Sequence, residues 1–252
     1  MEKDKRRERI IFAVLIALVI IINYPFLDGF LKKTFNDYEI ANVTKVIDGD
    51  TLKIGNESVR LLGINCPEKG EKFSSDATEF LAEKTLGKTV EIRYGKTKYD
   101  KYHRKLGYVF IDGENVNLEL VENGLANTYF PSGKNEYYPQ FISAWRECIE
   151  NGINLCKYSD DKCAKCIDLA NWEITEQIVV LENNCNFSCN LNEWSVKDEG
   201  RKKFIFGNIT LKSGESLSLT PKDFGKEYVW TKTGDTIYIR DSNSLLVLWE
   251  TY

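Results

Sequence analysis

The chain of 252 residues has little histidine and little net charge. Its only histidine is His103, which excludes a catalytic mechanism that needs two histidines. The formal net charge at pH 7 is -4, so the chain as a whole is neither a polybasic coat nor an acidic disordered tail. Any surface that binds a polyanion must therefore be local. A hydrophobic content of 42% is enough for more than one core, and we expect two domains.

The N-terminus combines a basic segment, residues 1–9, with an apolar segment, residues 10–27. The apolar segment approaches the roughly 20 residues that a membrane-spanning helix needs. No pair of small residues suited to signal-peptide cleavage follows it. Because basic residues stay on the cytoplasmic side, we expect an uncleaved, single-pass transmembrane anchor in the cell membrane, with the rest of the chain outside the cytoplasm. A cleaved signal peptide, which would give a secreted protein, and a buried helix of a soluble protein are the alternatives.

The seven cysteines fit an exported protein. Cys163 and Cys166 form one close pair and Cys185 and Cys189 another, and outside a membrane such pairs most often become disulfides. A zinc site that includes Cys156, Cys163 and Cys166 is the alternative, although the spacings differ from those of a zinc ribbon. The odd count leaves at least one thiol unpaired within the chain.

The first part of the chain predicts an α+β domain over residues 39–158. Residues 39–63 alternate between polar and apolar positions around two glycine-containing turns, which predicts a three-stranded meander. A helix with Ser74 or Ser75 as its N-cap follows, and then two further strands. Five strands with a helix after the third are typical of an OB-type barrel. Two more helices are expected from "VNLELVENG" and "QFISAWRECIENG".

The second part of the chain differs in character. Residues 159–170 show no sustained periodicity and read as a cysteine-containing linker. Residues 171–252 contain short apolar segments separated by Asn, Gly, Asp and Ser, which predicts an all-β, immunoglobulin-like sandwich. We expect Trp194 and Trp230 to fill its core rather than to stack on a ligand.

Oxygen donors cluster in two short motifs of the first domain. Asp50 ends the turn of "VIDGDT", and Asn65 and Cys66 lie in "VRLLGINCPE". Calcium prefers carboxylate, amide and carbonyl oxygens, so Asp50, Asn65 and the Cys66 backbone carbonyl could form one site that Asp48 helps to orient. In the alternative interpretation, Asp48-Gly49 only marks a hairpin turn.

Basic and aromatic residues cluster further along the same domain. Six Lys and Arg residues accompany one Asp between residues 93 and 105, with three tyrosines among them. Such a patch suits a phosphodiester backbone with bases that can stack. A solvated loop is the alternative.

Residues 41–158 resemble the staphylococcal (thermo)nuclease family, through "VIDGDT", "VRLLGINCPE" and "DKYHRKLGY" in this order. The resemblance implies an OB-barrel endonuclease that binds calcium and cleaves DNA and RNA with little sequence preference, leaving 3′-phosphates. It also implies residue roles. Glu68 matches the general base, and Arg60 and Arg104 match the pair that binds the scissile phosphate.

The resemblance assigns the remaining site residues as well. Side-chain calcium ligands correspond to Asp50 and Asn65, and the backbone ligand to the Cys66 carbonyl. Positions that hold the nucleotide correspond to Lys101, Tyr102 and Tyr129. Many family members carry an aspartate in place of Asn65, so calcium should bind more weakly here. Calcium sites with dissociation constants of about 10⁻⁴ to 10⁻³ M still fill outside the cell, where calcium is near millimolar.

Residues 171–252 are similar to lamin-tail domains, which implies a binding module for nucleic acid or for a cell-envelope ligand. The sequence thus predicts a membrane-anchored, calcium-dependent nuclease. The alternative is a non-catalytic surface protein that binds nucleic acid and has lost the metal chemistry. Glu68 favours the enzyme, because its charge would repel a ligand that is only bound. Asn65 favours the alternative.

Overall fold

The computed structural model describes residue 12, residue 19 and residues 38–252. The chain divides into two compact units, residues 1–39 and residues 40–252. The predicted basic segment and membrane anchor lie outside the described residues, apart from Phe12 and Val19. No helix within the described part of the chain is long and apolar enough to cross a membrane.

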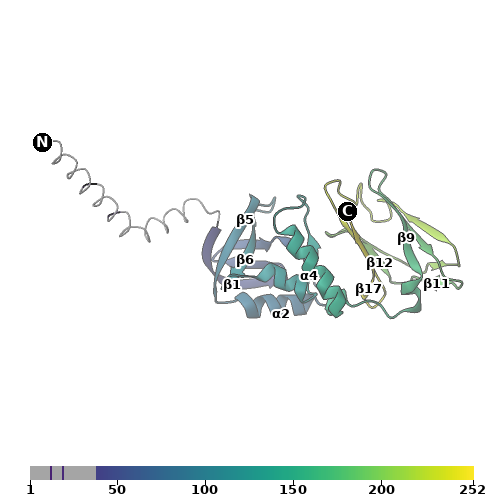
Figure 1. Cartoon of the computed structure of the whole chain (residues 1–252), viewed down its shortest axis with the longest axis horizontal. Coiled ribbons are helices and arrows are strands. Elements are labelled where there is room, and N and C mark those ends of the chain that lie inside the picture. The colour runs from purple at the N-terminus through teal and green to yellow at the C-terminus, as the bar shows by residue number, and fades with distance from the viewer. Residues whose placement is uncertain (1–11, 13–18, 20–37) are drawn as a thin grey trace. The chain divides into compact units, whose positions relative to one another are not determined.

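Five strands of the second unit form a closed barrel (Figure 1). The meander consists of β1 (Tyr38–Asp48), β2 (Thr51–Ile54) and β3 (Glu57–Leu61). β1 is followed in the sheet by β5 (Thr89–Tyr99), which pairs with β6 (Lys105–Ile111). A parallel pairing of β3 with β6 closes the barrel. The predicted five-stranded barrel is therefore confirmed.

Three helices accompany the barrel, as predicted: α2 (Ser74–Thr85), α3 (Val116–Glu122) and α4 (Tyr138–Asn151). The prediction that Ser74 or Ser75 caps α2 is wrong. The cap position is Phe73, which has a left-handed backbone and no side-chain hydrogen bond to the helix.

Short strands carry the chain from the barrel to its helices. β4 (Gly63–Asn65) pairs with β8 (Asn127–Tyr129), and β7 (Glu114–Asn115) extends the edge of β6. In the β4–β8 pair, Asn65 lies opposite Asn127 and Gly63 lies opposite Tyr129. The pairing therefore holds Asn65 and Tyr129 on neighbouring strands at one end of the barrel.

The C-terminal part of the same unit consists of small antiparallel sheets. The largest has the order β13-β12-β16-β17, a second has the order β15-β10-β9, and β11 pairs with β14. Trp194 and Trp230 are each 2% exposed in the core of this part, which confirms their predicted role. The strands are β9 (Ile167–Glu173), β10 (Ile178–Asn183), β11 (Cys189–Asn190), β12 (Ser195–Lys197), β13 (Lys203–Ile205), β14 (Thr210–Leu211), β15 (Ser216–Leu219), β16 (Thr236–Arg240) and β17 (Leu246–Thr251). We call residues 167–252 the C-terminal module.

The C-terminal module packs directly on the barrel domain. The Trp145 ring of α4 meets the rings of Tyr238 and Trp249 edge to face, with centroid distances of 5.5 and 6.3 Å. The buried Arg240 donates hydrogen bonds to the Leu155 carbonyl and to Asn127 Oδ1. Figure 1 shows α4 between the barrel strands and β17. The two parts therefore share an apolar and hydrogen-bonded interface.

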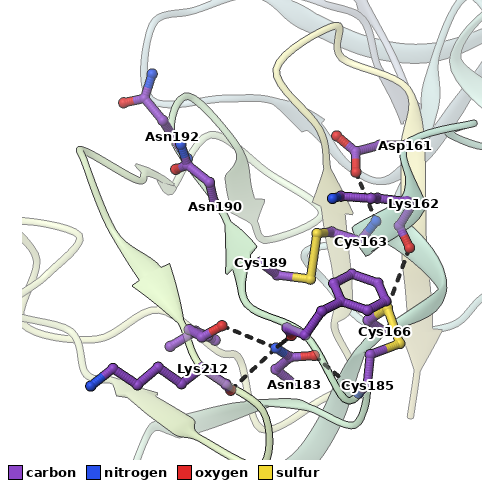
Figure 2. Close-up of a disulfide and its surroundings, with 12 residues drawn as sticks. Asp161, Lys162, Cys163, Cys166, Asn183, Cys185, Cys189, Asn190, Asn192 and Lys212 are labelled. Carbon is purple, nitrogen blue, oxygen red and sulfur yellow. Dashed lines mark hydrogen bonds between the residues drawn. A yellow bond between two sulfur atoms is a disulfide. The ribbon is translucent and has the colours of Figure 1, made fainter.

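The disulfides differ from the prediction. Cys163 bonds to Cys189 and Cys166 to Cys185 (Figure 2). Both cysteines of the 163–166 segment face the 185–189 segment, with Cα–Cα distances of 5.5 and 5.2 Å, so the pairs form between segments and not within them. This pairing overturns the predicted Cys163–Cys166 and Cys185–Cys189 bonds.

The remaining cysteines complete the pattern. Cys148 bonds to Cys156, so the thiols of the alternative zinc site are all in disulfides. Cys66 is the free cysteine and is buried, and this burial raises the pKa of its thiol. The predicted linker is also partly ordered, since it contains the 3₁₀ helix η2 (Lys162–Lys165) and the start of β9.

Candidate active site

A glycine turn brings Asp50 beside the loop that follows β4. The backbone N–H of Asp50 donates to Asp48 Oδ1 at 3.1 Å, which fixes the turn. A Cβ on Gly49 would lie 2.6 Å from Ala77 Cβ and 2.9 Å from Cys66 Cβ, so only glycine lets the turn pack here. The backbone N–H of Cys66 then donates to Asp50 Oδ2 at 3.2 Å.

Arg60 joins the two candidate side-chain ligands. Its buried guanidinium lies 2.9 Å from Asp50 Oδ2 and 3.2 Å from Asn65 Oδ1, both measured from Nη2. Its Nη1 donates to the backbone carbonyls of Leu61 and Ile64. Burial raises the pKa of the Asp50 carboxyl, and the charge of Arg60 opposes this rise. The carboxylate and the amide oxygen thus already converge on one positive charge.

This convergence tests whether the site suits calcium. Asp50 and Asn65 are each 3% exposed, and both direct an oxygen to Arg60 Nη2. The Cys66 backbone lies beside them through its bond to Asp50. No group of three or more His, Cys, Asp or Glu side chains suited to a metal occurs in the described part of the chain. The candidate set therefore consists of one carboxylate, one amide oxygen and one backbone carbonyl, which are ligand types that calcium accepts.

Glu68 lies two residues after Cys66 and is exposed. Its backbone N–H donates to Glu71 Oε2 at 2.9 Å. Its own carboxylate forms an ion pair with Arg201 of the C-terminal module, with 2.6 Å between Glu68 Oε1 and Arg201 Nε. The predicted base therefore has a hydrogen-bonded backbone and a solvent-exposed ion pair at its side chain.

Arg104 is placed by the turn between β5 and β6. Its Nε lies 2.7 Å from Asp100 Oδ2, and its backbone N–H donates to Asp100 Oδ1 at 2.9 Å. Lys101 and Tyr102 lie exposed on the same turn, and both Lys101 and Arg104 lie over the Tyr102 ring. The basic, aromatic segment is therefore an ordered turn.

A cleft of about 430 Å³ collects most of the predicted residues. An adjoining cavity of about 290 Å³ shares several of these residues and adds an apolar wall from Leu62, Tyr108 and Phe130. Asp48, Asp50, Cys66 and Glu68 do not line the large cleft, and Asp50 reaches it through Arg60. The predicted residues that line it are Arg60, Asn65, Lys101, Tyr102, Arg104 and Tyr129.

The other wall of the cleft was not predicted. It consists of the turn between β12 and β13, residues 198–202, together with Tyr228, Thr231 and Asp235. The dense charges of "VKDEGRKK" are the sequence signal for this turn, and they do not reveal what it contacts. Burial raises the pKa of the Asp198 carboxyl to about 6 and of the Glu199 carboxyl to about 8.

Comparison with known proteins agrees with this geometry. The sequence profile of the staphylococcal nuclease homologues matches residues 58–157. The thermonuclease of Staphylococcus intermedius is 31% identical over 158 residues, which cover 58% of this chain and 94% of that protein. An uncharacterized endonuclease of Haemophilus influenzae is 33% identical over 144 residues, which cover 55% and 75%.

A third relative is much longer than the matched region. The endonuclease YhcR of Bacillus subtilis is 36% identical over 124 residues, which cover 40% of this chain and 10% of that protein. The matched segments, the closed five-stranded barrel and the cleft together show that this chain belongs to the family of staphylococcal nuclease homologues.

Proposed function

We propose that the protein is a calcium-dependent endonuclease that hydrolyses phosphodiester bonds of DNA and RNA with little sequence preference. The observation that carries this proposal is the convergence of Arg60 and Arg104 on one cleft, with the Asp50 carboxylate paired to Arg60 behind it. Relatives named thermonuclease and endonuclease support the same activity.

The two arginines suit the phosphate. Attack on a phosphodiester builds negative charge on the equatorial oxygens, and preorganised positive groups stabilise that charge more than they stabilise the ground state. Guanidinium groups can hold two phosphate oxygens at once. Arg60 is held by two backbone carbonyls through Nη1 and by Asp50 and Asn65 through Nη2, so its positive charge is fixed at the cleft. Arg104 is held by Asp100. Calcium, held by Asp50, Asn65 and the Cys66 carbonyl, would add positive charge at a phosphate oxygen.

Glu68 would serve as the general base. Its carboxylate accepts a proton from the attacking water, whose oxygen forms the new bond to phosphorus. The bond from phosphorus to the 5′-oxygen breaks, the 5′-oxygen takes a proton from solvent water to become a hydroxyl, and the 3′-phosphate remains on the upstream product. Lys101, Tyr102 and Tyr129 would hold the nucleotide, because a lysine, a stackable ring and a half-buried tyrosine line the same cleft.

We propose a single-pass anchor in residues 10–27 and an active site outside the cytoplasm. Three disulfides support this location, since disulfides persist in oxidising compartments. A site with one carboxylate also suits the roughly millimolar calcium found outside cells. If the N-terminal segment is cleaved, the protein is secreted.

The C-terminal module would act as a lamin-tail-like binding domain for nucleic acid or for a cell-envelope ligand. Its sheets and buried tryptophans support a stable sandwich. A second candidate function, a non-catalytic binder of nucleic acid, is favoured by one observation, the uncharged amide of Asn65 at a ligand position.

The test is a cleavage assay with the full chain in mild detergent, on single-stranded DNA and on RNA, in millimolar calcium or in EGTA. Cleavage that needs calcium and leaves 3′-phosphate ends supports the proposal. Salt-sensitive binding without cleavage at any calcium concentration supports the non-catalytic binder instead.

A further inference from the structure

Two consecutive residues of the C-terminal module reach two different parts of the candidate active site. The Asn65 amide nitrogen, Nδ2, donates to the Gly200 carbonyl at 2.9 Å. The next residue, Arg201, forms the ion pair with Glu68. One turn therefore contacts both the amide that would bind calcium and the carboxylate that would accept the proton.

The turn is itself held firmly. The backbone N–H of Lys202 donates to Asp198 Oδ1 at 2.8 Å, which closes the turn. Glu199 ties it to the barrel, because the Phe130 N–H donates to Glu199 Oε1 at 3.1 Å. The Lys197 ammonium group donates to the Gly200 carbonyl. Asp198 and Glu199 are 4% and 5% exposed, so the turn is a packed part of the cleft wall.

The contact with Gly200 accounts for the amide at residue 65. Asn65 uses its Nδ2 group as a donor to Gly200 and its Oδ1 atom as an acceptor from Arg60. This pair of bonds fixes the amide oxygen on the side of Arg60 and the amide nitrogen on the side of Gly200. A carboxylate at residue 65 has no donor when ionised, so one of its oxygens would face the Gly200 carbonyl oxygen without a hydrogen atom between them.

We propose that the 198–202 turn is a positioning element of the nuclease site: Gly200 orients Asn65 Oδ1 toward the Arg60 guanidinium that also pairs with Asp50, and Arg201 holds the Glu68 carboxylate. This inference rests on the proposed function and adds to it that the C-terminal module supplies part of the site. Partners that orient ligands and catalytic groups commonly affect metal affinity or activity by about 10- to 100-fold.

The role of Arg201 is tested by measuring the cleavage kinetics of Arg201→Ala and Arg201→Lys. The full chain is used in mild detergent, with millimolar calcium and a single-stranded oligonucleotide. We expect Arg201→Ala to lower kcat by about tenfold while KM changes by less than about twofold, and Arg201→Lys to recover part of kcat. Lys84→Ala is the control, because it removes the same charge from another partly exposed ion pair, with Glu119.

The role of Gly200 is tested by calcium titration calorimetry without nucleic acid. A Cβ at Gly200 would lie 3.3 Å from both Tyr129 Cε2 and Asp198 Oδ2, so Gly200→Val should push the turn away from Asn65. We expect its calcium dissociation constant to rise by about tenfold. Gly207→Val is the matched control, because a Cβ there meets no atom within 4 Å.

Several results would overturn the inference. An increased kcat in Arg201→Ala would show that the turn inhibits the reaction. A rise in KM alone would show that Arg201 contacts the substrate. Unchanged calcium binding in Gly200→Val would remove the role of Gly200. A wild-type chain that binds calcium and cleaves nothing would overturn the proposed function alone. The calorimetry would still test whether Gly200 affects calcium binding.

Discussion

The guanidinium of Arg60 lies 2.9 Å from the carboxylate of Asp50, and both side chains are less than 10% exposed. Removing one partner of a buried ion pair leaves an uncompensated charge, which typically costs about 3 to 5 kcal/mol. The same carboxylate is the one charged ligand of the candidate calcium site. The pair therefore links the stability of the barrel to the presence of a cation.

Arg60→Ala should accordingly lower the free energy of unfolding by about 3 kcal/mol in EGTA, and millimolar calcium should restore part of this loss. Urea unfolding followed by fluorescence, with and without calcium, measures both effects. Arg104→Ala is the comparison, because its pair with Asp100 is more exposed and should change stability by less than about 1 kcal/mol. Equal losses in the two variants would contradict the role of the buried pair.

Asn65→Asp should have opposite effects without and with calcium. In EGTA, the new carboxylate loses the hydrogen bond to Gly200, so the free energy of unfolding should fall by about 1 to 3 kcal/mol. In calcium, the added charge should tighten calcium binding. The increase in melting temperature from EGTA to calcium should therefore be larger for Asn65→Asp than for the wild type. Differential scanning fluorimetry gives both values. Asn192→Asp, at an exposed residue, is the control, and equal behaviour of the two variants would refute the contact with Gly200.

The pH dependence of stability should reflect the ionisation of the Glu199 carboxyl. Burial and then the charge of Asp235 raise the pKa of its carboxyl from 4.5 to about 8, while the Phe130 N–H and Lys197 oppose the rise. Because the folded chain holds this proton more tightly than the unfolded chain, the stabilisation is fully present below pH 4.5 and is lost as the pH rises through about 8.

Glu199→Gln should therefore reduce the loss of stability between pH 6 and pH 9. The difference between the wild-type and variant melting temperatures, measured at several pH values, isolates Glu199 from other groups such as Lys197. Parallel curves for the two proteins would show that Glu199 does not hold the proton in the folded state.

The two nested disulfides of the C-terminal module give a prediction that does not depend on activity. Peptide mapping without reduction should recover the pairs Cys163–Cys189 and Cys166–Cys185. These bonds span 26 and 19 residues, so removing either should cost about 3 kcal/mol. Recovery of a Cys163–Cys166 peptide would contradict this structure.

Much of the barrel could be predicted from the sequence because its signals are local. Alternation of polar and apolar residues marks β1 to β3, and the glycine at residue 49 marks the turn that brings Asp50 to the loop after β4. Arg60, Tyr102 and Arg104 lie in short motifs, and the structure places them around one cleft.

The second wall of the cleft could not be predicted, because its contacts join residues far apart in the chain. Asn65 and Gly200 are 135 positions apart, and no periodicity links them. The prediction of the disulfide pairs failed for a related reason. Spacing favours neighbours such as Cys163 and Cys166, but the partner of each is set by how the 163–166 and 185–189 segments pack.

We propose a calcium-dependent nuclease whose general base is Glu68. The most direct measurement compares wild type, Glu68→Gln and the exposed-site control Glu79→Gln for cleavage of single-stranded DNA in millimolar calcium, with EGTA as the blank and calcium binding measured separately. We expect cleavage by wild type and control that EGTA abolishes, and a loss of about 100-fold or more in Glu68→Gln with calcium binding retained. Cleavage at the wild-type rate by Glu68→Gln, or salt-sensitive binding of DNA by the wild type without cleavage, would contradict the account.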